Sequence, residues 1–330
     1  MSLENKVILL TGGTGSFGQK FSEISLREYN PKVIRIFSRG ELLQQEMRQR
    51  FNDDEKLRFF IGDIRDRDRL YRAMDGVDIV VHAAALKQVP TCEYNPVEAV
   101  KTNIDGAVNV VDAAIDSGVE KAIAISTDKA AHPVNLYGAT KLVMETLFVQ
   151  ANVYTGKGKT RFSCTRYGNV VGSRGSVVPL FLEQGKNGTI TITDERMTRF
   201  WITLEQGVRF VIDCIGRMQG GEVFLPKIPS MKITDIAAIA APEAKREIIG
   251  IRPGEKVNET LLTEEEALHA REFDDYFVVE PEYPYWRKDN ISGGKPLPPG
   301  FKYTSDSNGW WLTREELKRM LEVTGGATGD

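Results

Sequence analysis

The turn after the first apolar segment constrains the fold of this chain more than any other feature of its sequence. Val7–Thr11 is a short aliphatic run, and Gly12, Gly13, Gly15 and Gly18 follow it before a stretch with helical spacing of apolar residues. Glycines at this place permit a tight turn and let a dinucleotide pyrophosphate approach the backbone at a helix N-terminus. The turn therefore predicts a dinucleotide-binding unit. A glycine-rich turn without a ligand is the alternative.

Short runs rich in Val and Ile alternate with amphipathic stretches along the first half of the chain. The expected strands are Val7–Thr11, Val33–Phe37, Leu57–Ile61, Ile79–Ala83, Ala122–Ser126 and Arg161–Tyr167. The expected helices are Phe17–Tyr29, Glu41–Phe51, Asp66–Met74, Val97–Ser117 and Tyr137–Val153. This alternation is typical of parallel strands that are buried on both faces and joined by right-handed crossovers. We predict the α/β class, with a Rossmann-type doubly wound parallel sheet.

The end of the second expected strand indicates which dinucleotide binds. An NAD site usually has an acidic residue here, about 20 residues past the glycines, for the ribose 2′-hydroxyl. This chain has Ser38 and Arg39, which suit the 2′-phosphate of NADP, and Glu41 keeps NAD open as an alternative. Asp63, just past the third strand, is expected to accept a hydrogen bond from the adenine, or otherwise to cap the next helix.

The length of 330 residues exceeds the size at which single cores stop growing, so a second, smaller unit is expected. After Gly168 the alternation of strands and helices weakens, and prolines interrupt it. We predict that residues 1–170 form the NADP-binding domain and that residues 203–226 return to it. Residues 171–202 and 227–330 are predicted to form a smaller C-terminal α/β lobe that binds the substrate, and the tail from Gly325 to Asp330 is expected to fray.

The overall composition is that of an ordinary globular protein. Hydrophobic residues make up 41% of the chain, charged residues 27%, and the net charge is -3, which argues against a nucleic-acid or anionic-membrane partner. No stretch of about 18 apolar residues occurs, and we expect a cytoplasmic protein. The three cysteines are far apart, so reduced thiols are expected and no metal site is predicted.

Residues that could carry chemistry cluster around the end of the fifth expected strand. Tyr137 and Lys141 are four residues apart and share one helix face, where the ammonium would lower the pKa of the phenol. Such a pair also occurs by chance. Thr127, Asp128 and Lys129 follow the strand directly, at the edge of the sheet where ligands bind. An ordinary ion pair or helix cap is the alternative for Asp128 and Lys129.

The order of these motifs resembles the extended short-chain dehydrogenase/reductase family. The glycine turn, His82–Ala85, Ser126–Thr127 and the Tyr137/Lys141 pair occur in the expected order. Nucleotide-sugar 4,6-dehydratases of that family have Thr-Asp-Glu where this chain has Thr127, Asp128 and Lys129. The lysine, together with Leu86–Pro90, resembles the inverting UDP-N-acetylglucosamine 4,6-dehydratases. Further segments are similar to theirs, almost up to the Pro281 loop: Ser126–Ala131, Leu136–Lys141, Arg166–Gly175, Arg196–Trp201 and Arg252–Lys256.

This resemblance implies a redox-neutral elimination with UDP-N-acetylglucosamine as the substrate. Tyr137, supported by Lys141, would take the C4 hydroxyl proton as hydride passes to NADP. Lys129, with its pKa lowered by burial or by Lys141, would remove the C5 proton, and Asp128 would protonate the departing C6 hydroxyl. Hydride would then return to C6, and C5 would be reprotonated from the opposite face. Because membrane-anchored and capsule-type relatives typically have Met at position 137, the Tyr favours the type that begins pseudaminic acid synthesis for flagellin or other surface glycans.

The resemblance also implies binding residues and an assembly. Arg199 and Arg252 are the candidates for the diphosphate, although surface ion pairs are an alternative for either. Asn169 and Glu255 are expected to contact the sugar or uridine, and Lys87 the cofactor ribose or the sugar. The expected cofactor contacts are Gly12, Thr14, Gly15, Ser16, Phe17, Gly18, Ser38, Arg39, Glu41, Asp63, Ile64, Ala84, Lys87, Tyr137 and Lys141. A homo-oligomer is implied, with a hexamer as one form.

Two other functions fit part of the pattern. An NADP-dependent nucleotide-sugar 4-epimerase shares the glycine turn and the Tyr137/Lys141 pair, but it needs no acid and base for an elimination. A catalytically silent NADP-binding regulatory protein would usually have lost the Tyr or the Lys of the catalytic set, and this chain has both.

Overall fold

The computed structural model describes residues 2–155, 160–171, 177–281 and 293–325. Its centre is a ten-stranded sheet, whose first six strands are β1 (Val7–Thr11), β2 (Val33–Ser38), β3 (Leu57–Ile61), β4 (Ile79–His82), β5 (Lys121–Thr127) and β6 (Arg161–Tyr167). These six are parallel and lie in the order β3-β2-β1-β4-β5-β6. The predicted Rossmann-type sheet is therefore confirmed, and each predicted strand agrees with an observed one to within one residue at either end.

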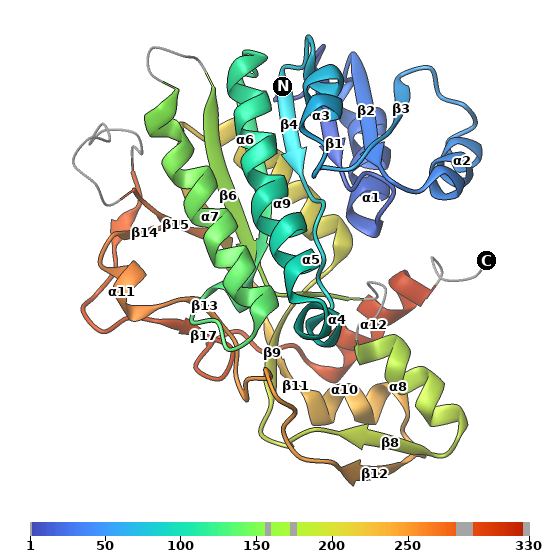
Figure 1. The fold of residues 1–330 in the computed structure, drawn as a ribbon. Coiled ribbons are helices and arrows are strands. Elements are labelled where there is room, and N and C mark those ends of the chain that lie inside the picture. The colour runs from blue at the N-terminus through green and yellow to red at the C-terminus, as the bar shows by residue number, and fades with distance from the viewer. Residues whose placement is uncertain (1, 156–159, 172–176, 282–292, 326–330) are drawn as a thin grey trace.

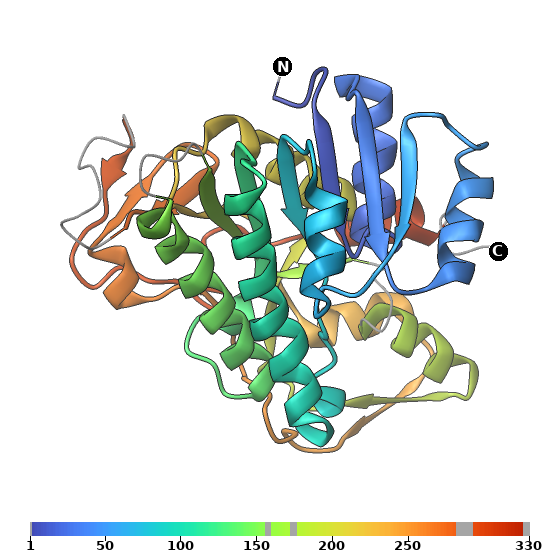
Figure 2. The same ribbon diagram turned by 45° about the horizontal axis from the view of Figure 1, so that its top comes forward.

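Helices cover both faces of the sheet (Figures 1 and 2). One face carries α3 (Arg67–Met74), α6 (Gly106–Asp116) and α7 (Leu136–Tyr154), which pack side by side. The other face carries α1 (Ser16–Ile24) and α9 (Leu204–Arg217), and α2 (Glu41–Arg50) lies beside the β3 edge. Strands between two helical layers are buried on both sides, which is why β4 consists of Ile, Val, Val and a buried His82.

Two of the predicted helices are less regular than expected. The stretch Val97–Ser117 is divided into α5 (Pro96–Val100), a π-helical turn (Lys101–Asp105) and α6. The first helix likewise ends in a π-helical turn (Ser25–Tyr29). Apolar spacing does not distinguish a π turn from an α-helix over so few residues.

The sheet continues beyond β6 with residues from the second half of the chain. Strand β10 (Val223–Pro226) pairs in parallel with β6, and β15 (Tyr276–Val279), β14 (Ala270–Glu272) and β16 (Lys295–Pro296) extend the sheet in antiparallel fashion. Residues 270–279 and 295–296 fall in the range predicted for the substrate lobe, but they belong to the main sheet. The domain boundary itself stays a prediction.

A second hydrophobic cluster lies at the carboxyl ends of the parallel strands. It joins α8 (Val177–Lys186), α10 (Ile233–Ala240) and α12 (Arg314–Gly325) with the two-stranded sheet of β8 (Thr189–Ile192) and β12 (Lys245–Ile248). A three-stranded sheet of β7 (Asn169–Val170), β9 (Thr198–Ile202) and β11 (Ser230–Lys232) connects this lobe to the main sheet. Smaller elements complete the fold: α4 (Val89–Tyr94), the 3-10 turn η3 (Asp128–Ala130), β13 (Thr260–Leu262), α11 (Glu264–Ala267) and β17 (Tyr303–Thr304).

A buried ionic cluster fixes the outer helices to the sheet. The Arg166 side chain on β6 is 1% exposed and forms paired hydrogen bonds with Glu145 on α7 and with Glu266 on α11. A planar guanidinium can donate two hydrogen bonds to each of two carboxylates in good geometry. This cluster lies outside the cleft described below, so it has a structural role.

The three cysteines are buried free thiols. Across the described parts of the chain, none of the helices combines the length and apolar character that crossing a membrane would require.

Candidate active site

A cleft of about 1090 Å³ lies between the carboxyl ends of the parallel strands and the second lobe. Of the predicted site residues, all but Gly18 and Glu41 line it. The lobe contributes an apolar wall, formed by Val177, Leu180, Phe181, Met197 and Ile233. The cleft therefore brings the expected cofactor, catalytic and substrate residues to one place, as expected for the open edge of a doubly wound sheet.

The glycine turn forms one end of this cleft. Gly12 has φ 68°, and a Cβ there would come within 2.9 Å of the Ala84 backbone. Helix α1 begins after Gly15, which makes no side-chain cap, and its first turn has no acidic residue. Its N-terminal N–H groups are thus left for an anion, which fits a pyrophosphate. Gly18 lies beneath the turn, where a Cβ would be 2.2 Å from the Gly13 carbonyl oxygen.

The carboxyl end of β2 forms the corner where an adenosine ribose would lie. Ser38 accepts a hydrogen bond from Gln44 Nε2 at 3.0 Å, and the exposed Arg39 lies 3.9 Å from Asp63. Asp63 is already paired with Arg65, at 2.7 Å. Glu41 is exposed on the first turn of α2 and does not line the cleft. The corner thus offers a hydroxyl and a guanidinium rather than a free carboxylate.

The end of β5 places three polar side chains next to one another. Thr127 Oγ1 donates to Asp128 Oδ1 at 2.8 Å, and Lys129 Nζ donates to the same oxygen at 3.1 Å. The Asp128 side chain is fully buried, and its Oδ2 atom has no hydrogen-bond partner among the described residues. A buried carboxylate oxygen without a partner is costly, so Oδ2 is free to receive a group in the cleft.

The electrostatics of Lys129 differ from the sequence-based expectation. Burial lowers its pKa, but the carboxylates of Asp128 and Glu259 raise the pKa by more, so the pKa lies above its ordinary value. The prediction that burial or Lys141 would leave Lys129 with a lowered pKa is wrong. The reason is a second carboxylate, Glu259, whose Oε1 lies 3.5 Å from Lys129 Nζ.

Tyr137 also differs from the expectation. Burial raises its pKa to about 12, although the charge of Lys129 and the Thr127 side chain act in the opposite direction. Lys141 Nζ instead donates to the Ile125 carbonyl at 2.6 Å, and burial lowers the pKa of Lys141 to about 8. The prediction that the Lys141 ammonium lowers the pKa of Tyr137 is therefore wrong here, because burial is the larger influence and Lys129 supplies the nearby charge.

A buried asparagine that the sequence-based prediction missed holds the loop after β4. Asn103 forms paired hydrogen bonds with the Leu86 backbone, at 2.8 and 2.9 Å, and donates to Thr140 on α7 at 3.0 Å. Lys87, the next residue of that loop, lines the cleft, and burial lowers its pKa. Asn103 lies on the π-helical turn, so the irregular helix positions this loop against the helix that carries Tyr137.

The two arginines predicted for the diphosphate have different surroundings. Both Nη atoms of Arg199 donate to backbone carbonyls, those of Thr198, Val257 and Lys256, and its side chain is 10% exposed. Arg252 is exposed and lines the cleft. Arg252 is therefore better placed for an incoming anion, whereas the donors of Arg199 are largely used within the protein.

Asn169 on β7 and Glu255 line the cleft as well, and Glu255 Oε2 is buried without a hydrogen-bond partner among the described residues. Residues 172–175 of the motif that begins at Arg166 lie outside the described residues, as does the tail after residue 325.

Sequence reasoning missed Glu259 and gave Lys256 no role in the site. Glu259 is 2% exposed, lines the cleft, and lies about 130 positions from Lys129 in the sequence. Its local signal was weak, because a glutamate before a short apolar run is common. Only the adjacent segment Arg252–Lys256 had indicated that this region belongs to the site.

Comparisons with known proteins show the family to which the chain belongs. The family model described as "Polysaccharide biosynthesis protein" matches residues 8–281. The chain is 52% identical to the UDP-N-acetylglucosamine 4,6-dehydratase (inverting) of Campylobacter jejuni subsp. jejuni serotype O:2, over 97% of this chain and 98% of that protein. It is 42% identical to a UDP-glucose 4-epimerase of Rickettsia conorii, over 96% and 95% of the two chains.

Solved structures show the same likeness. The X-ray structure of Pen from Bacillus thuringiensis matches with a TM-score of 0.89 at 40% identity, over 98% of this chain and 99% of that one. DesIV, a dTDP-glucose 4,6-dehydratase from Streptomyces venezuelae with NAD and TYD bound, shares the fold at 22% identity, with a TM-score of 0.69 over 76% and 86%. From the fold, the family model and the full-length relatives together, this chain belongs to the polysaccharide biosynthesis protein family, within the extended short-chain dehydrogenases/reductases.

Proposed function

We propose that this chain is a UDP-N-acetylglucosamine 4,6-dehydratase that inverts C5 and uses bound NADP. The observation that carries the proposal is the Asp128–Lys129 pair in the cleft beside Tyr137 and Thr127. Asp128 Oδ1 and Lys129 Nζ lie 3.1 Å apart. An elimination needs an acid and a base on neighbouring carbons, and this pair supplies both. The inverting dehydratase of Campylobacter jejuni, at 52% identity, supports the substrate.

The residues of the glycine turn would hold the pyrophosphate of the cofactor, and Ser38 with Arg39 would hold a 2′-phosphate. The chemistry that a bound NADP supplies is reversible hydride transfer, out of C4 and back into C6. Heating the purified protein and separating the released dinucleotide by chromatography tests the cofactor. We expect NADP, and release of NAD alone would contradict the assignment to Ser38 and Arg39.

The first step is removal of the proton from the C4 hydroxyl, for which Tyr137 is the base. Thr127 lies beside Tyr137 and donates to Asp128, so hydroxyl groups connect the base at C4 with the acid at C6. The protons of the whole reaction balance. The C4 hydroxyl gives up one proton through Tyr137, and one proton is taken up when C5 is reprotonated. The proton for the departing C6 hydroxyl comes from Asp128 and Lys129 gains the C5 proton, so the protein ends unchanged.

The second step is removal of the C5 proton by Lys129 and loss of water from C6. The ammonium–carboxylate pair of Lys129 and Asp128 becomes an amine and a carboxylic acid when one proton moves across their 3.1 Å hydrogen bond. That tautomer holds both the base for C5 and the acid for C6, with no change in net charge. The raised pKa of Lys129 is therefore compatible with its role, because the proton can go to its neighbour rather than to solvent.

After the elimination, a proton returns to C5 on the opposite face and sets the L configuration. The product is then a UDP-2-acetamido-2,6-dideoxy-L-arabino-hexos-4-ulose, and the reaction is that of a hydro-lyase. Arg252 is the arginine that we assign to the diphosphate, with Asn169, Glu255 and Lys87 toward the sugar. A product of this kind would serve pseudaminic acid or another surface glycan, a pathway that rests on the sequence resemblance.

The mass of the product tests the proposed function directly. Incubation with UDP-N-acetylglucosamine is expected to yield a nucleotide sugar lighter by one water. The Rickettsia conorii relative makes a 4-epimerase the second candidate, and an epimerase product would have unchanged mass. If the protein binds the dinucleotide but catalyses neither reaction, it matches the third alternative, a catalytically silent NADP-binding regulatory protein.

A further inference from the structure

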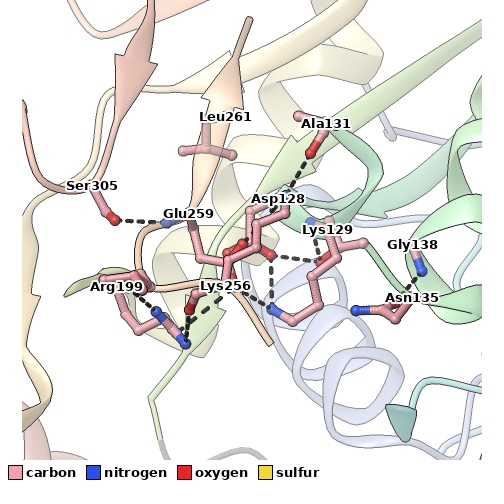
Figure 3. A network of polar contacts seen from close by, with 12 residues as sticks. Asp128, Lys129, Ala131, Asn135, Gly138, Arg199, Lys256, Glu259, Leu261 and Ser305 are labelled. Carbon is pink, nitrogen blue, oxygen red and sulfur yellow. Dashed lines mark hydrogen bonds and ion pairs between the residues drawn. The ribbon is translucent and has the colours of Figure 1, made fainter. Parts of the chain in front are cut away.

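A third carboxylate lies against the proposed acid–base pair. Glu259, which precedes β13, has a side chain that is 3% exposed, and its Oε1 atom lies 3.5 Å from Lys129 Nζ. Figure 3 shows the Glu259 side chain beside those of Asp128 and Lys129. Asp128 binds the same nitrogen at 3.1 Å. Lys129 is thus shared between two buried carboxylates, only one of which the elimination uses.

Two cations flank the Glu259 carboxylate. Arg199 Nε on β9 lies 3.8 Å from Oε1, and Lys256 Nζ, three residues before Glu259 in the chain, lies 3.8 Å from Oε2, which has no hydrogen-bond partner among the described residues. Arg199 is fixed by its hydrogen bonds to backbone carbonyls, and Lys256 Nζ donates to the Ala131 carbonyl at 2.6 Å. The backbone N–H of Glu259 donates to Ser305 Oγ at 2.9 Å. A move of the carboxylate away from Lys129 would therefore also separate it from Arg199 and Lys256.

The balance of positive and negative charge in this cluster depends on Glu259. Lys129, Arg199 and Lys256 carry three positive charges, and Asp128 and Glu259 carry two negative charges. The Tyr137 phenol and the Thr127 hydroxyl also lie beside Lys129. If Glu259 were neutral, Lys129 would face one carboxylate and two fixed cations, and its ammonium form would lose most of its compensation.

We propose that Glu259 is a positioning residue for Lys129: its fixed negative charge holds the ammonium at Asp128 and favours the protonated form that Lys129 takes on when it removes the C5 proton. The catalytic part of this inference rests on the proposed dehydratase function, but the electrostatic part does not. A negative charge that stays in place stabilises the developing ammonium without reorganisation, so it strengthens Lys129 as a base. In the elimination Asp128 changes its protonation state, and Glu259 keeps its own.

The protonation of Lys129 can be measured without turnover. Trace acetylation of the folded protein across a pH series, followed by mass spectrometry of the peptide that contains Lys129, reports the fraction of free amine at each pH. In E259Q we expect the acetylation curve of Lys129 to move to lower pH by about one to two units. E259D keeps the charge on a shorter side chain and should lie closer to the wild type.

The control is E266Q, which removes a partly buried carboxylate that pairs with Arg166 outside the cleft. E266Q is expected to lower the free energy of unfolding but to leave the pH dependence of Lys129 acetylation unchanged. If E259Q does not fold, the acetylation of Lys129 in D128N tests the proposal instead. In that variant, Glu259 is the carboxylate that is left beside Lys129. Lys129 should stay protonated at neutral pH in D128N, and a fully reactive amine there would overturn the proposal, as would a wild-type curve for folded E259Q.

Activity gives the second measurement. If the chain is the proposed dehydratase, the pH profile of kcat for water loss in E259Q should move in the same direction as the acetylation curve, with a lower maximum. An unmoved profile would show that Glu259 does not act through Lys129 in catalysis and would overturn that part of the proposal. A chain that forms no dehydrated product fails as a dehydratase, and the acetylation curve still decides the electrostatic claim.

Discussion

At the scale of single residues, burial and neighbouring carboxylates together decide the protonation of the lysines in this cleft. Lys141 is 4% exposed, and its Nζ donates to the Ile125 carbonyl. Burial lowers its pKa to about 8, and the neighbouring Cys164 and Glu145 only partly oppose this effect. The Lys129 side chain is 25% exposed, and two carboxylates raise its pKa above the ordinary value. The pKa values of the two lysines are therefore shifted in opposite directions within one site.

K141M is expected to stabilise the fold and to abolish turnover. The unfolded chain holds this proton up to the ordinary pKa of 10.5, and the folded chain releases it near pH 8, so stability from this group rises with pH between these values. Methionine removes the penalty, so at pH 7 the free energy of unfolding should rise by roughly 1–3 kcal/mol. Most of the gain should be gone by about pH 10, and it should vanish above the ordinary pKa of 10.5. Urea unfolding at both pH values measures it, and a gain that persists at the higher pH would contradict burial as the cause.

Residues next to one another in the sequence were the ones that could be predicted. Asp128 and Lys129 follow a strand directly, and the Tyr137/Lys141 pair lies on one helix face, so their proximity follows from local structure. Glu259 reaches Lys129 from a different segment, and no local pattern relates the two. The error in the predicted pKa of Lys129 has the same origin, because the second carboxylate was not foreseen.

At the scale of elements, the close contact between the glycine turn and α1 leads to a test. A Cβ on Gly18 would lie 2.2 Å from the Gly13 carbonyl oxygen. We expect G18A to cost roughly 1–3 kcal/mol in unfolding free energy and to purify with less bound dinucleotide. G309A is the control, since nothing lies within 4 Å of that position. Wild-type stability and dinucleotide content in G18A would show that the turn tolerates the methyl group.

Elements with strong periodicity were predicted well, and elements that depend on distant partners were not. The six parallel strands follow from their own apolar runs, which must be buried on both faces. The antiparallel strands β15, β14 and β16 are short, and their place depends on pairing with β10, β15 and β14, respectively. The π-helical turn that carries Asn103 has the apolar spacing of an ordinary helix.

At the scale of the whole molecule, exposed apolar side chains on α5, α6 and α7 fit the homo-oligomer that the sequence resemblance implies. Val97, Val100, Val108, Leu142 and Val143 are each at least 36% exposed, on helices that pack together on one face of the sheet. We expect V143E to move the assembly toward smaller species in light scattering, with dissociation at protein concentrations about tenfold higher or more. L42E, which alters an exposed leucine on α2, is the control. Unchanged assembly in V143E would exclude this face as the interface.

The central claim is that Asp128 and Lys129 turn a reductase fold into a dehydratase. The measurement that tests it most directly is NMR of the product formed from UDP-N-acetylglucosamine in heavy water, with wild-type protein and with K129A. For the wild type, the account predicts a 4-keto-6-deoxy sugar of L configuration with deuterium at C5, and K129A should give no exchange at C5. A wild-type product that keeps its C6 hydroxyl, or normal deuterium uptake at C5 in K129A, would contradict the account.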